Sequence, residues 1–354
     1  GNLRTNENPM LLSMTLLWFR NHNYHADRLA ILHPNWDDER LFFEARKWVI
    51  AEYQNIVAYQ WLPAWINDNL PAYPGYNPAL NPELTHEFQT AALRFGHTLV
   101  APGGYRRDAQ CNFFNTTAAT SRVPNKLAMR ICNTYGRARE FVDETPDGFE
   151  RILMGLASQI CEREDAVVTE DLRGFLFGPI DANRLDLMAI NLQRGRDHGV
   201  ADYNTVRVAF KLNPVANFSD ITTNATLADA LARIYNNNIS NVDLWAGGLA
   251  ESTPNGPGPL FSAITKEQFG RLRDADRFWF ENTDNKLFND TEIATVRATT
   301  LHDIIVRVTN IPATAIQQDV FHHVPGDPCP QPKQLELEDL EECSPPQTYD
   351  YFGP

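Results

Sequence analysis

The sequence predicts a mainly α-helical fold with long loops. Apolar residues recur three and four positions apart over many segments, whereas the strict alternation of a half-buried strand is nearly absent. Stretches rich in proline, asparagine and tyrosine, such as residues 68–82, separate these segments and predict loops. With 354 residues, 43% of them hydrophobic, the chain is long enough to enclose a large core.

The N-terminal part predicts three helices. The first covers residues 10–31, and Asp37 and Asp38 can cap a second, long helix that ends near Pro63. The third carries apolar residues at helical spacing: Leu84, Phe88, Ala91, Ala92, Phe95 and Leu99.

The next segment, residues 104–146, is polar with little apolar periodicity and predicts a surface excursion. Further helices are expected in residues 148–165, 201–212, 226–235, 265–282 and 291–309. Capping signals occur at or next to three of these helix starts: Thr226 with Asp229, Thr265 with Gln268, and Asp290. Residues 325–354 are proline-rich and acidic, and predict an extended tail or linker after a domain of residues 1–324.

The charge balance narrows the class of protein. The formal net charge is -14 and no run of lysine or arginine offsets it, which argues against nucleic-acid binding. No stretch approaches the ~20 apolar residues of a membrane span. The chain opens at Gly1 without a methionine or a signal peptide, so we expect it to be part of a longer or processed protein.

Sequons and cysteines favour the secretory pathway and an extracellular location. The five candidate glycosylation sites are Asn115, Asn217, Asn224, Asn238 and Asn289. The chain has five cysteines, and the sequence does not determine how they pair. One possibility is Cys111 with Cys132 and Cys329 with Cys343, which would leave Cys161 unpaired.

The helix around residues 85–99 carries Arg94 and His97 three residues apart, before Pro102. Burying a charged side chain costs free energy unless an anion lies next to it. This side of the helix is therefore a candidate lining of a cofactor pocket. The alternative is a core histidine bonded to a carbonyl, with Arg94 in an ion pair.

Two other segments carry clustered polar residues. One ends an apolar run with Asn191, Arg194, Arg196, Asp197 and His198, which predicts either a binding site or caps and bridges. The other is His22-x-x-His25, where a surface or packing role is favoured because no nearby cysteine or acidic residue lies at metal-ligand spacing.

Taken together and in order, several blocks resemble the animal haem peroxidase family. They are RTNENPMLLSMTLLWFRNHN, ERLFFEARKWVIAEYQNIVAYQWLP, RFGHTLV, INLQRGRDHGVADYN and GRLRDADRFWFEN. Within that family the peroxidase-like domain of the dual oxidases is most similar, since it shares ASQICERED, GDPCPQPKQL and the final DYF.

The resemblance implies a role for each matching residue. His97 would be the axial ligand of haem iron, and Asn191 would bond its other imidazole nitrogen and assist catalysis in that way. Arg94 and Arg194 would meet the haem propionates. Vertebrate dual oxidases lack this axial histidine, so the retained His97 resembles an invertebrate, haem-competent form.

On the opposite haem face, the family uses an arginine and a glutamate three residues apart, which match Arg4 and Glu7. Arg4 would stabilise charge on the breaking peroxide, and Glu7 would form an ester to a haem b methyl. Asn8 replaces the methionine that forms a sulfonium link in some members. The family's distal histidine, second ester carboxylate and calcium loop lie upstream of this chain, so the N-terminal, distal part of the domain is expected to be missing here.

The implied function is an extracellular haem peroxidase that uses hydrogen peroxide to oxidise phenolic, halide or thiocyanate substrates. In a dual oxidase, an NADPH oxidase module of the same polypeptide would make the peroxide at the plasma membrane, and a maturation factor would be a partner. The alternative is a haem-poor scaffold domain that supports folding, maturation-factor binding and docking to the oxidase module.

Overall fold

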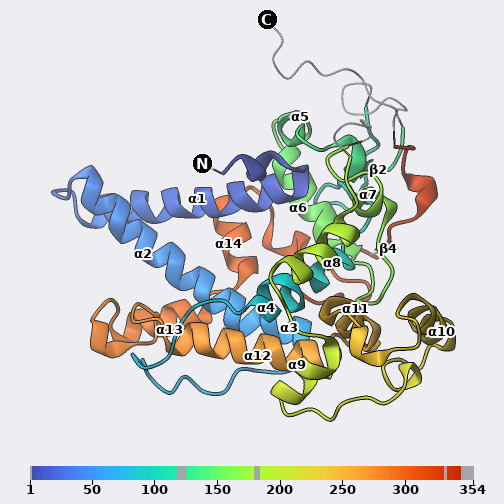
Figure 1. Cartoon of the computed structure of the whole chain (residues 1–354). Helices are drawn as coiled ribbons and strands as arrows, with labels where there is room; N and C mark the ends of the chain where they lie inside the picture. Colours follow the sequence, from blue (N-terminus) through green and yellow to red (C-terminus); the bar gives the residue numbers. More distant parts are fainter. Residues whose placement is uncertain (1, 118–124, 179–183, 331–332, 344–354) are drawn as a thin grey trace, which may run out of the picture.

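The computed structural model describes residues 2–117, 125–178, 184–330 and 333–343, and is mainly α-helical as predicted (Figure 1). The α-helices are α1 (Pro9–Leu32), α2 (Asp38–Ile56), α3 (Leu62–Ile66), α4 (His86–Thr90), α5 (Ala138–Val142), α6 (Gly148–Ala157), α7 (Glu170–Arg173), α8 (Leu187–Asp197), α9 (Tyr203–Ala209), α10 (Ala225–Ile234), α11 (Leu244–Ala250), α12 (Pro259–Asp274), α13 (Asp290–Ala298) and α14 (Leu301–Val308).

Shorter elements complete the fold. The turns of tighter helix are η1 (Leu3–Asn6), η3 (Ala92–His97), η4 (Ile131–Asn133), η5 (Phe218–Asp220), η6 (Ile239–Asn241), η7 (Thr283–Asn285), η8 (Ala313–Ala315) and η9 (Leu337–Asp339), and η2 (Val57–Trp61) is a π-helical turn. The strands are β1 (Gly103–Tyr105), β2 (Ala128–Arg130), β3 (Gln159–Ile160) and β4 (Lys333–Gln334). β1 and β2 are antiparallel, whereas β3 and β4 are parallel.

The first two long helices begin where the sequence places capping residues. Asn8 Oδ1 accepts from the backbone N–H of Leu11 (2.9 Å), and Pro9 opens α1 with its fixed φ. Asp37 caps α2 through Arg40 N–H (2.9 Å). The two helices pack against each other and project together on the left of Figure 1.

The third predicted helix is broken. α4 ends at Thr90, Ala91 leaves the helical region (φ -127°, ψ -73°), and the chain continues as the 3-10 helix η3. The prediction of one continuous α-helix is wrong because the same apolar spacing of three residues fits both kinds of helix.

The prediction of a surface excursion over residues 104–146 is also wrong. Tyr105, Met129 and Phe141 are each exposed by 1% or less, and β1 pairs with β2 in this segment. The approach of β1 to α6 is so close that a Cβ on Gly155 would lie 1.9 Å from the carbonyl oxygen of Tyr105. Strands of three residues are too short for their alternation to be read from the sequence.

Several helices in the C-terminal half begin at other residues than predicted. Asn224, not Thr226, caps α10, and Asn289, not Asp290, caps α13. α12 begins at Pro259, so Thr265 and Gln268 are buried within it. The last predicted helix is two helices, because Thr300 begins a new capping box at the start of α14.

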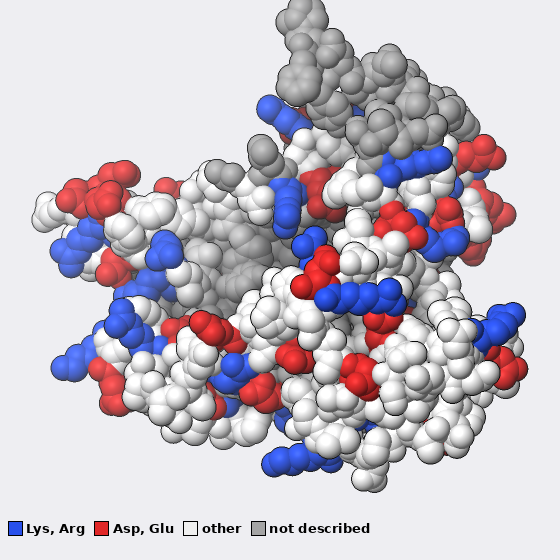
Figure 2. All heavy atoms as spheres, viewed as in Figure 1, with Lys and Arg blue, Asp and Glu red and all other residues white. Residues whose placement is uncertain are grey.

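The main hydrophobic core lies where α2, α3, η3, α9, α11 and α12 meet, and a second core joins α1, α6 and α14. No helix among the described residues is long and apolar enough to cross a bilayer. Figure 2 shows acidic and basic side chains interspersed over one face, which is hollowed between α1 and α8.

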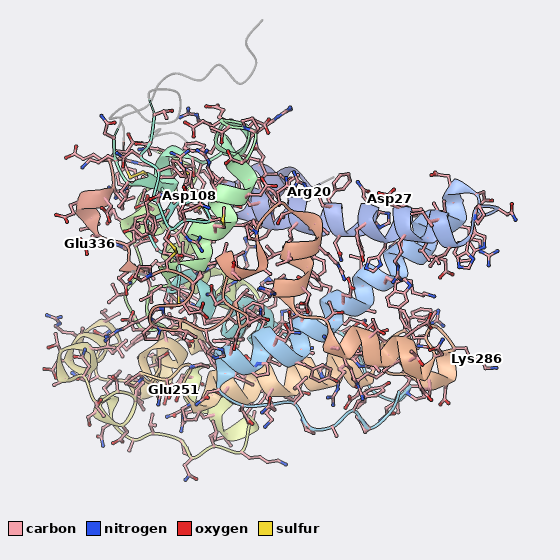
Figure 3. All side chains as sticks on the ribbon, turned by 180° about the vertical axis from the view of Figure 1, so that it is seen from behind. Arg20, Asp27, Asp108, Glu251, Lys286 and Glu336 are labelled. Carbon is pink, nitrogen blue, oxygen red and sulfur yellow. A yellow bond between two sulfur atoms is a disulfide. The ribbon has the colours of Figure 1, made fainter. Side chains whose placement is uncertain are left out.

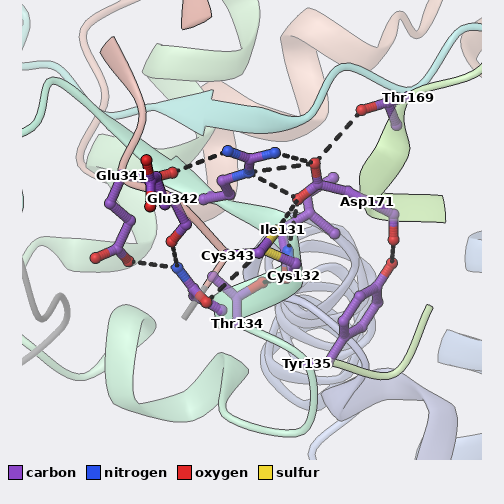
Figure 4. Close-up of a disulfide and its surroundings, with 11 residues drawn as sticks. Ile131, Cys132, Thr134, Tyr135, Thr169, Asp171, Glu341, Glu342 and Cys343 are labelled. Atoms are coloured by element: carbon purple, nitrogen blue, oxygen red, sulfur yellow. Dashed lines mark hydrogen bonds and ion pairs between the residues drawn. A yellow bond between two sulfur atoms is a disulfide. The ribbon is translucent and has the colours of Figure 1, made fainter. Parts of the chain in front are cut away.

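Two disulfides join the middle of the chain to its C-terminal part (Figure 3). They pair Cys111 with Cys329 and Cys132 with Cys343, so the pairings of near neighbours considered from the sequence are wrong. Cys161 is free and exposed. In Figure 4 the Cys132–Cys343 bond lies beside Asp171, whose carboxylate accepts from the N–H of Cys132 (2.9 Å).

The described part of the tail packs onto the domain. Leu335 and Leu340 are buried in a cluster with Tyr105 and Ala128, and β4 pairs with β3. The division of the chain after residue 324 stays a prediction.

Candidate functional site

The short helix η3 presents Arg94 and His97 on one side. In a 3-10 helix, residues three apart lie one above the other, so both side chains project in the same direction. The other side is anchored: Phe95 is buried and stacks on Trp65, with ring centroids 3.4 Å apart. Trp245 Nε1 donates to the carbonyl oxygen of Arg94 (3.3 Å). The helix is therefore held firmly behind its two polar side chains.

Helix α8 supplies the partner of His97. Asp186 caps this helix through the N–H groups of Met188 and Ala189, and Asn191 follows one turn later, fully buried. Asn191 Nδ2 donates to Nδ1 of His97 (2.8 Å), and Asn191 Oδ1 accepts from Nη1 of Arg94 (2.8 Å). One amide thus joins both side chains of η3.

The imidazole of His97 is neutral at physiological pH. Burial, and secondarily the positive charge of Arg94, lower its pKa to about 4. Because Nδ1 accepts from Asn191, the proton of the neutral ring is on Nε2. Within the described residues, Nε2 has no hydrogen-bond partner. The alternative of a core histidine bonded to a carbonyl is therefore not what the structure contains.

The guanidinium group of Arg94, which lies near this histidine, has that of Arg194 as a neighbour. Burial lowers the pKa of Arg94, and the charge of Arg194 lowers it further. Neither arginine forms an ion pair with any described carboxylate, whereas Arg196 on the same helix pairs with Asp243 (2.7 Å). Two neighbouring positive charges without a carboxylate partner favour the binding of an anion.

The N-terminal block is docked onto the loop around Gly136. Asn6 Nδ2 donates to the carbonyl oxygen of Gly136 (2.8 Å), and Gly136 N–H donates to the carbonyl oxygen of Glu7 (3.1 Å). Glu7 is half-buried; burial raises the pKa of its carboxyl group, and the charge of Arg4 opposes this. Arg4 itself is exposed.

A small hydrophobic cluster brings this block near the other two. Met10 of α1, Val100 just after η3 and Ile190 of α8 all pack against one buried cluster, which consists of Ile131, Tyr135, Leu172 and Leu176. Residues that are far apart in the sequence thus gather around one centre. The structure brings Asn191, Arg94 and His97 into direct contact and places Arg194 near Arg94, but shows no contact between these four residues and Arg4 or Glu7.

The two histidines of His22-x-x-His25 are engaged in different contacts. His25 is 2% exposed and its Nε2 bonds Glu52 (3.0 Å), while His22 packs on Phe42. Arg307 also pairs with Glu52. The packing role favoured from the sequence is confirmed.

Sequence reasoning missed a cavity of about 650 Å³ behind η3. Phe95, Trp61, Trp65 and the buried Glu164 line it. Glu164 accepts from Trp65 Nε1 (2.9 Å) and from Ser252 Oγ (3.4 Å), and burial raises the pKa of its carboxyl group to about 7. No local pattern in the sequence marks this carboxyl group, because its neighbours come from distant segments.

Comparisons with known proteins identify the family of the chain. Residues 1–321 match the family described as animal haem peroxidase. The dual oxidase of Drosophila melanogaster is 47% identical over 100% of this chain and 23% of its own length, and dual oxidase 1 of Homo sapiens is 47% identical over 99% and 23%. The chain thus spans less than a quarter of the length of these relatives.

Solved structures share the fold. Peroxidase A of Dictyostelium discoideum superimposes with a TM-score of 0.78 at 34% identity, over 90% of this chain and 58% of that one. A fatty acid alpha-dioxygenase of Arabidopsis thaliana superimposes with a TM-score of 0.73 over 97% of this chain and 56% of that one. Its 17% identity supports the similarity of fold alone.

Proposed function

The chain belongs to the animal haem peroxidase family, and on that premise we propose that it binds haem through His97 and serves as the peroxidase domain of a dual oxidase. The observation that carries the proposal is the contact between Asn191 and His97. It holds the imidazole by one nitrogen, while the other, Nε2, has no partner among the residues that the structure describes.

The residues present fit a haem group. An imidazole with a low pKa keeps the lone pair that a metal needs, and a buried amide orients it. Arg94 and Arg194 offer two unpaired positive charges for two propionates. Bound haem would supply the chemistry of peroxide-driven oxidation.

Metal ligation requires a change at Asn191. Nε2 can bind a metal only when the ring proton is on Nδ1, and Nδ1–H must then donate to the amide oxygen. The amide would turn by half a rotation, so that Oδ1 faces His97 instead of Arg94. Nη1 of Arg94 would lose this acceptor and become available for a propionate, while Nε keeps its bond to the carbonyl oxygen of Gln89 (3.2 Å). Cofactor binding and release of Arg94 are thereby coupled.

On the peroxide side, Arg4 would offer its positive charge to the breaking O–O bond, and Glu7 is positioned on the same segment as a candidate ester link. The raised pKa of Glu7 reflects burial, as expected for a carboxyl group near an apolar cofactor face. The upstream residues implied by the resemblance would supply the base. Phenols, halides or thiocyanate are the proposed electron donors.

The wider context follows from the relatives. In a dual oxidase an NADPH oxidase module would supply the hydrogen peroxide, and a maturation factor is a candidate partner. The two disulfides favour an extracellular position. The candidate glycosylation sites are all exposed: Asn115, Asn217, Asn224, Asn238 and Asn289. Calcium is expected only upstream.

A titration of the full chain with haemin tests the proposal. The Soret absorption of the complex should shift from that of free haemin and saturate at one haem per chain. His97→Ala should abolish this shift, while His33→Ala, which changes an exposed histidine stacked on Trp36, should preserve it. Failure of the wild-type chain to bind haem, including when extended upstream, would favour the scaffold function instead.

A further inference from the structure

Two histidines outside the haem site face each other on the surface. His86, the first residue of α4, and His198, at the C-terminal end of α8, bring their Nδ1 atoms within 2.7 Å. Their ring centroids are 4.9 Å apart. In the sequence the two residues lie 112 positions apart. One ring donates and the other accepts in this hydrogen bond.

The backbone holds both rings at this separation. Thr85 caps α4 through the N–H of Phe88 (3.2 Å), and its own N–H donates to Oε1 of Gln268 (2.8 Å). The N–H of His198 donates to the carbonyl oxygen of Arg194 (3.1 Å), which closes the last turn of α8. The helices α4 and α8 also pack against each other. The pair is therefore built by two fixed elements.

The two nitrogens lie close enough together for one ion to bind both. With bonds of about 2.0 Å, two nitrogens at neighbouring corners of a tetragonal ion lie about 2.8 Å apart, and at tetrahedral corners about 3.3 Å. From the 2.7 Å of the hydrogen bond, a turn of each ring would direct both lone pairs at one ion with the smaller of these separations. Among divalent first-row ions, Cu²⁺ prefers tetragonal geometry and binds imidazole most tightly.

We propose that His86 and His198 together bind one Cu²⁺ ion through their Nδ1 atoms. In the part of the chain that the structure describes, no third histidine, cysteine or carboxylate completes the pair at ligand distance. Water therefore fills the remaining positions, and the site is open to solvent on the side of the exposed His86. As the ion binds, the donor ring changes tautomer: its Nδ1 proton is lost to water and its Nε2 takes up a proton, so that both Nδ1 lone pairs face the ion.

The site has a structural consequence. α4 leads directly into η3, which carries His97, and α8 carries Asn191. A metal bridge between His86 and His198 ties together the two elements that meet at the His97–Asn191 hydrogen bond. Since the ion binds only the folded arrangement, it stabilises the folded chain.

Copper binding to the full chain tests this inference. Cu²⁺ is titrated against a competing chelator, and the paramagnetic resonance spectrum of the complex is recorded. We expect one tight ion per chain, a tetragonal spectrum with two coupled nitrogens, and a higher melting temperature. His86→Ala and His198→Ala should each weaken binding at least tenfold, whereas His33→Ala should leave it unchanged.

A second variant separates this site from the haem site. His97→Ala should retain full copper affinity, because its ring is not part of the pair. Unchanged affinity in both His86→Ala and His198→Ala, with circular dichroism showing a folded chain, would overturn the inference. So would loss of copper binding in His97→Ala alone.

Discussion

Asn191 donates a hydrogen bond to Nδ1 of His97 while its oxygen accepts from Arg94, so a single buried amide determines where the imidazole proton resides. With this orientation of the amide, the proton of the neutral ring is on Nε2. If Nε2 is the atom that binds haem iron, as proposed above, the amide would present its oxygen to Nδ1–H instead.

The first prediction concerns this amide. Asn191→Ala removes the group that orients His97, and we expect haemin affinity to fall about 10- to 100-fold. Gln193→Ala is the matched control, because Gln193 lies on the same helix but is exposed and bonds only Asp197. Equal haemin affinity in the two variants would contradict the role of Asn191.

The second prediction concerns the unpaired guanidinium of Arg194. Arg194→Gln removes a charge that repels Arg94, so the unfolding free energy of the haem-free chain should stay within about 0.5 kcal/mol of the wild type. Haemin affinity should nevertheless fall about three- to tenfold, because one propionate loses its partner. Arg196→Gln, which breaks the ion pair with Asp243, should leave haemin affinity intact. Titrations of both variants measure the difference.

The third prediction concerns the cavity carboxyl of Glu164. Its pKa is about 7 in the folded chain against an ordinary value of 4.5, so the unfolded chain loses this proton first as the pH rises. The protonated carboxyl group of Glu164 therefore stabilises the folded chain below about pH 4.5, and this contribution is lost as the pH rises to about 7. Glu164→Gln removes this slope and should be more stable than the wild type by about 1–3 kcal/mol at pH 8. Urea unfolding from pH 5 to 8 measures this; parallel pH profiles would refute it.

The fourth prediction concerns the disulfides. Replacing Cys132 and Cys343 by serine should lower the unfolding free energy by about 2–5 kcal/mol, because the unfolded chain loses one of its two long-range cross-links. Cys161→Ser should change it by no more than about 0.5 kcal/mol, since this thiol is exposed and unpaired. Denaturant unfolding under non-reducing conditions compares them. A stable double variant would show that the bond contributes little.

The sequence predicted the long helices well because their apolar stripes are long. α1 and α2 repeat their pattern over 24 and 19 residues, so the period is unambiguous. β1 and β2 have three residues each, and no period can be read from so few positions. The caps at Asn224 and Asn289 were missed by one or two residues, because several neighbouring polar side chains suit the same role.

The candidate site depended on the family resemblance. No spacing rule connects His97 to Asn191, which lies 94 residues later, because only the packing of η3 against α8 creates that contact. The disulfide pairing failed for the same reason: proximity in the chain favoured Cys111 with Cys132, whereas the fold brings each to a partner more than 200 residues away. Local chemistry can be read from a sequence, but long-range partners require the fold.

The long reach of both disulfides affects how the protein must be made. A ribosome adds about 5–20 residues per second, so Cys111 and Cys132 emerge some 10–40 seconds before their correct partners exist. During that interval each is the other's nearest thiol, and closing the short loop between them costs the least entropy. Correct biosynthesis thus requires either that these thiols stay reduced until synthesis is complete, or that an isomerase undoes the early bond.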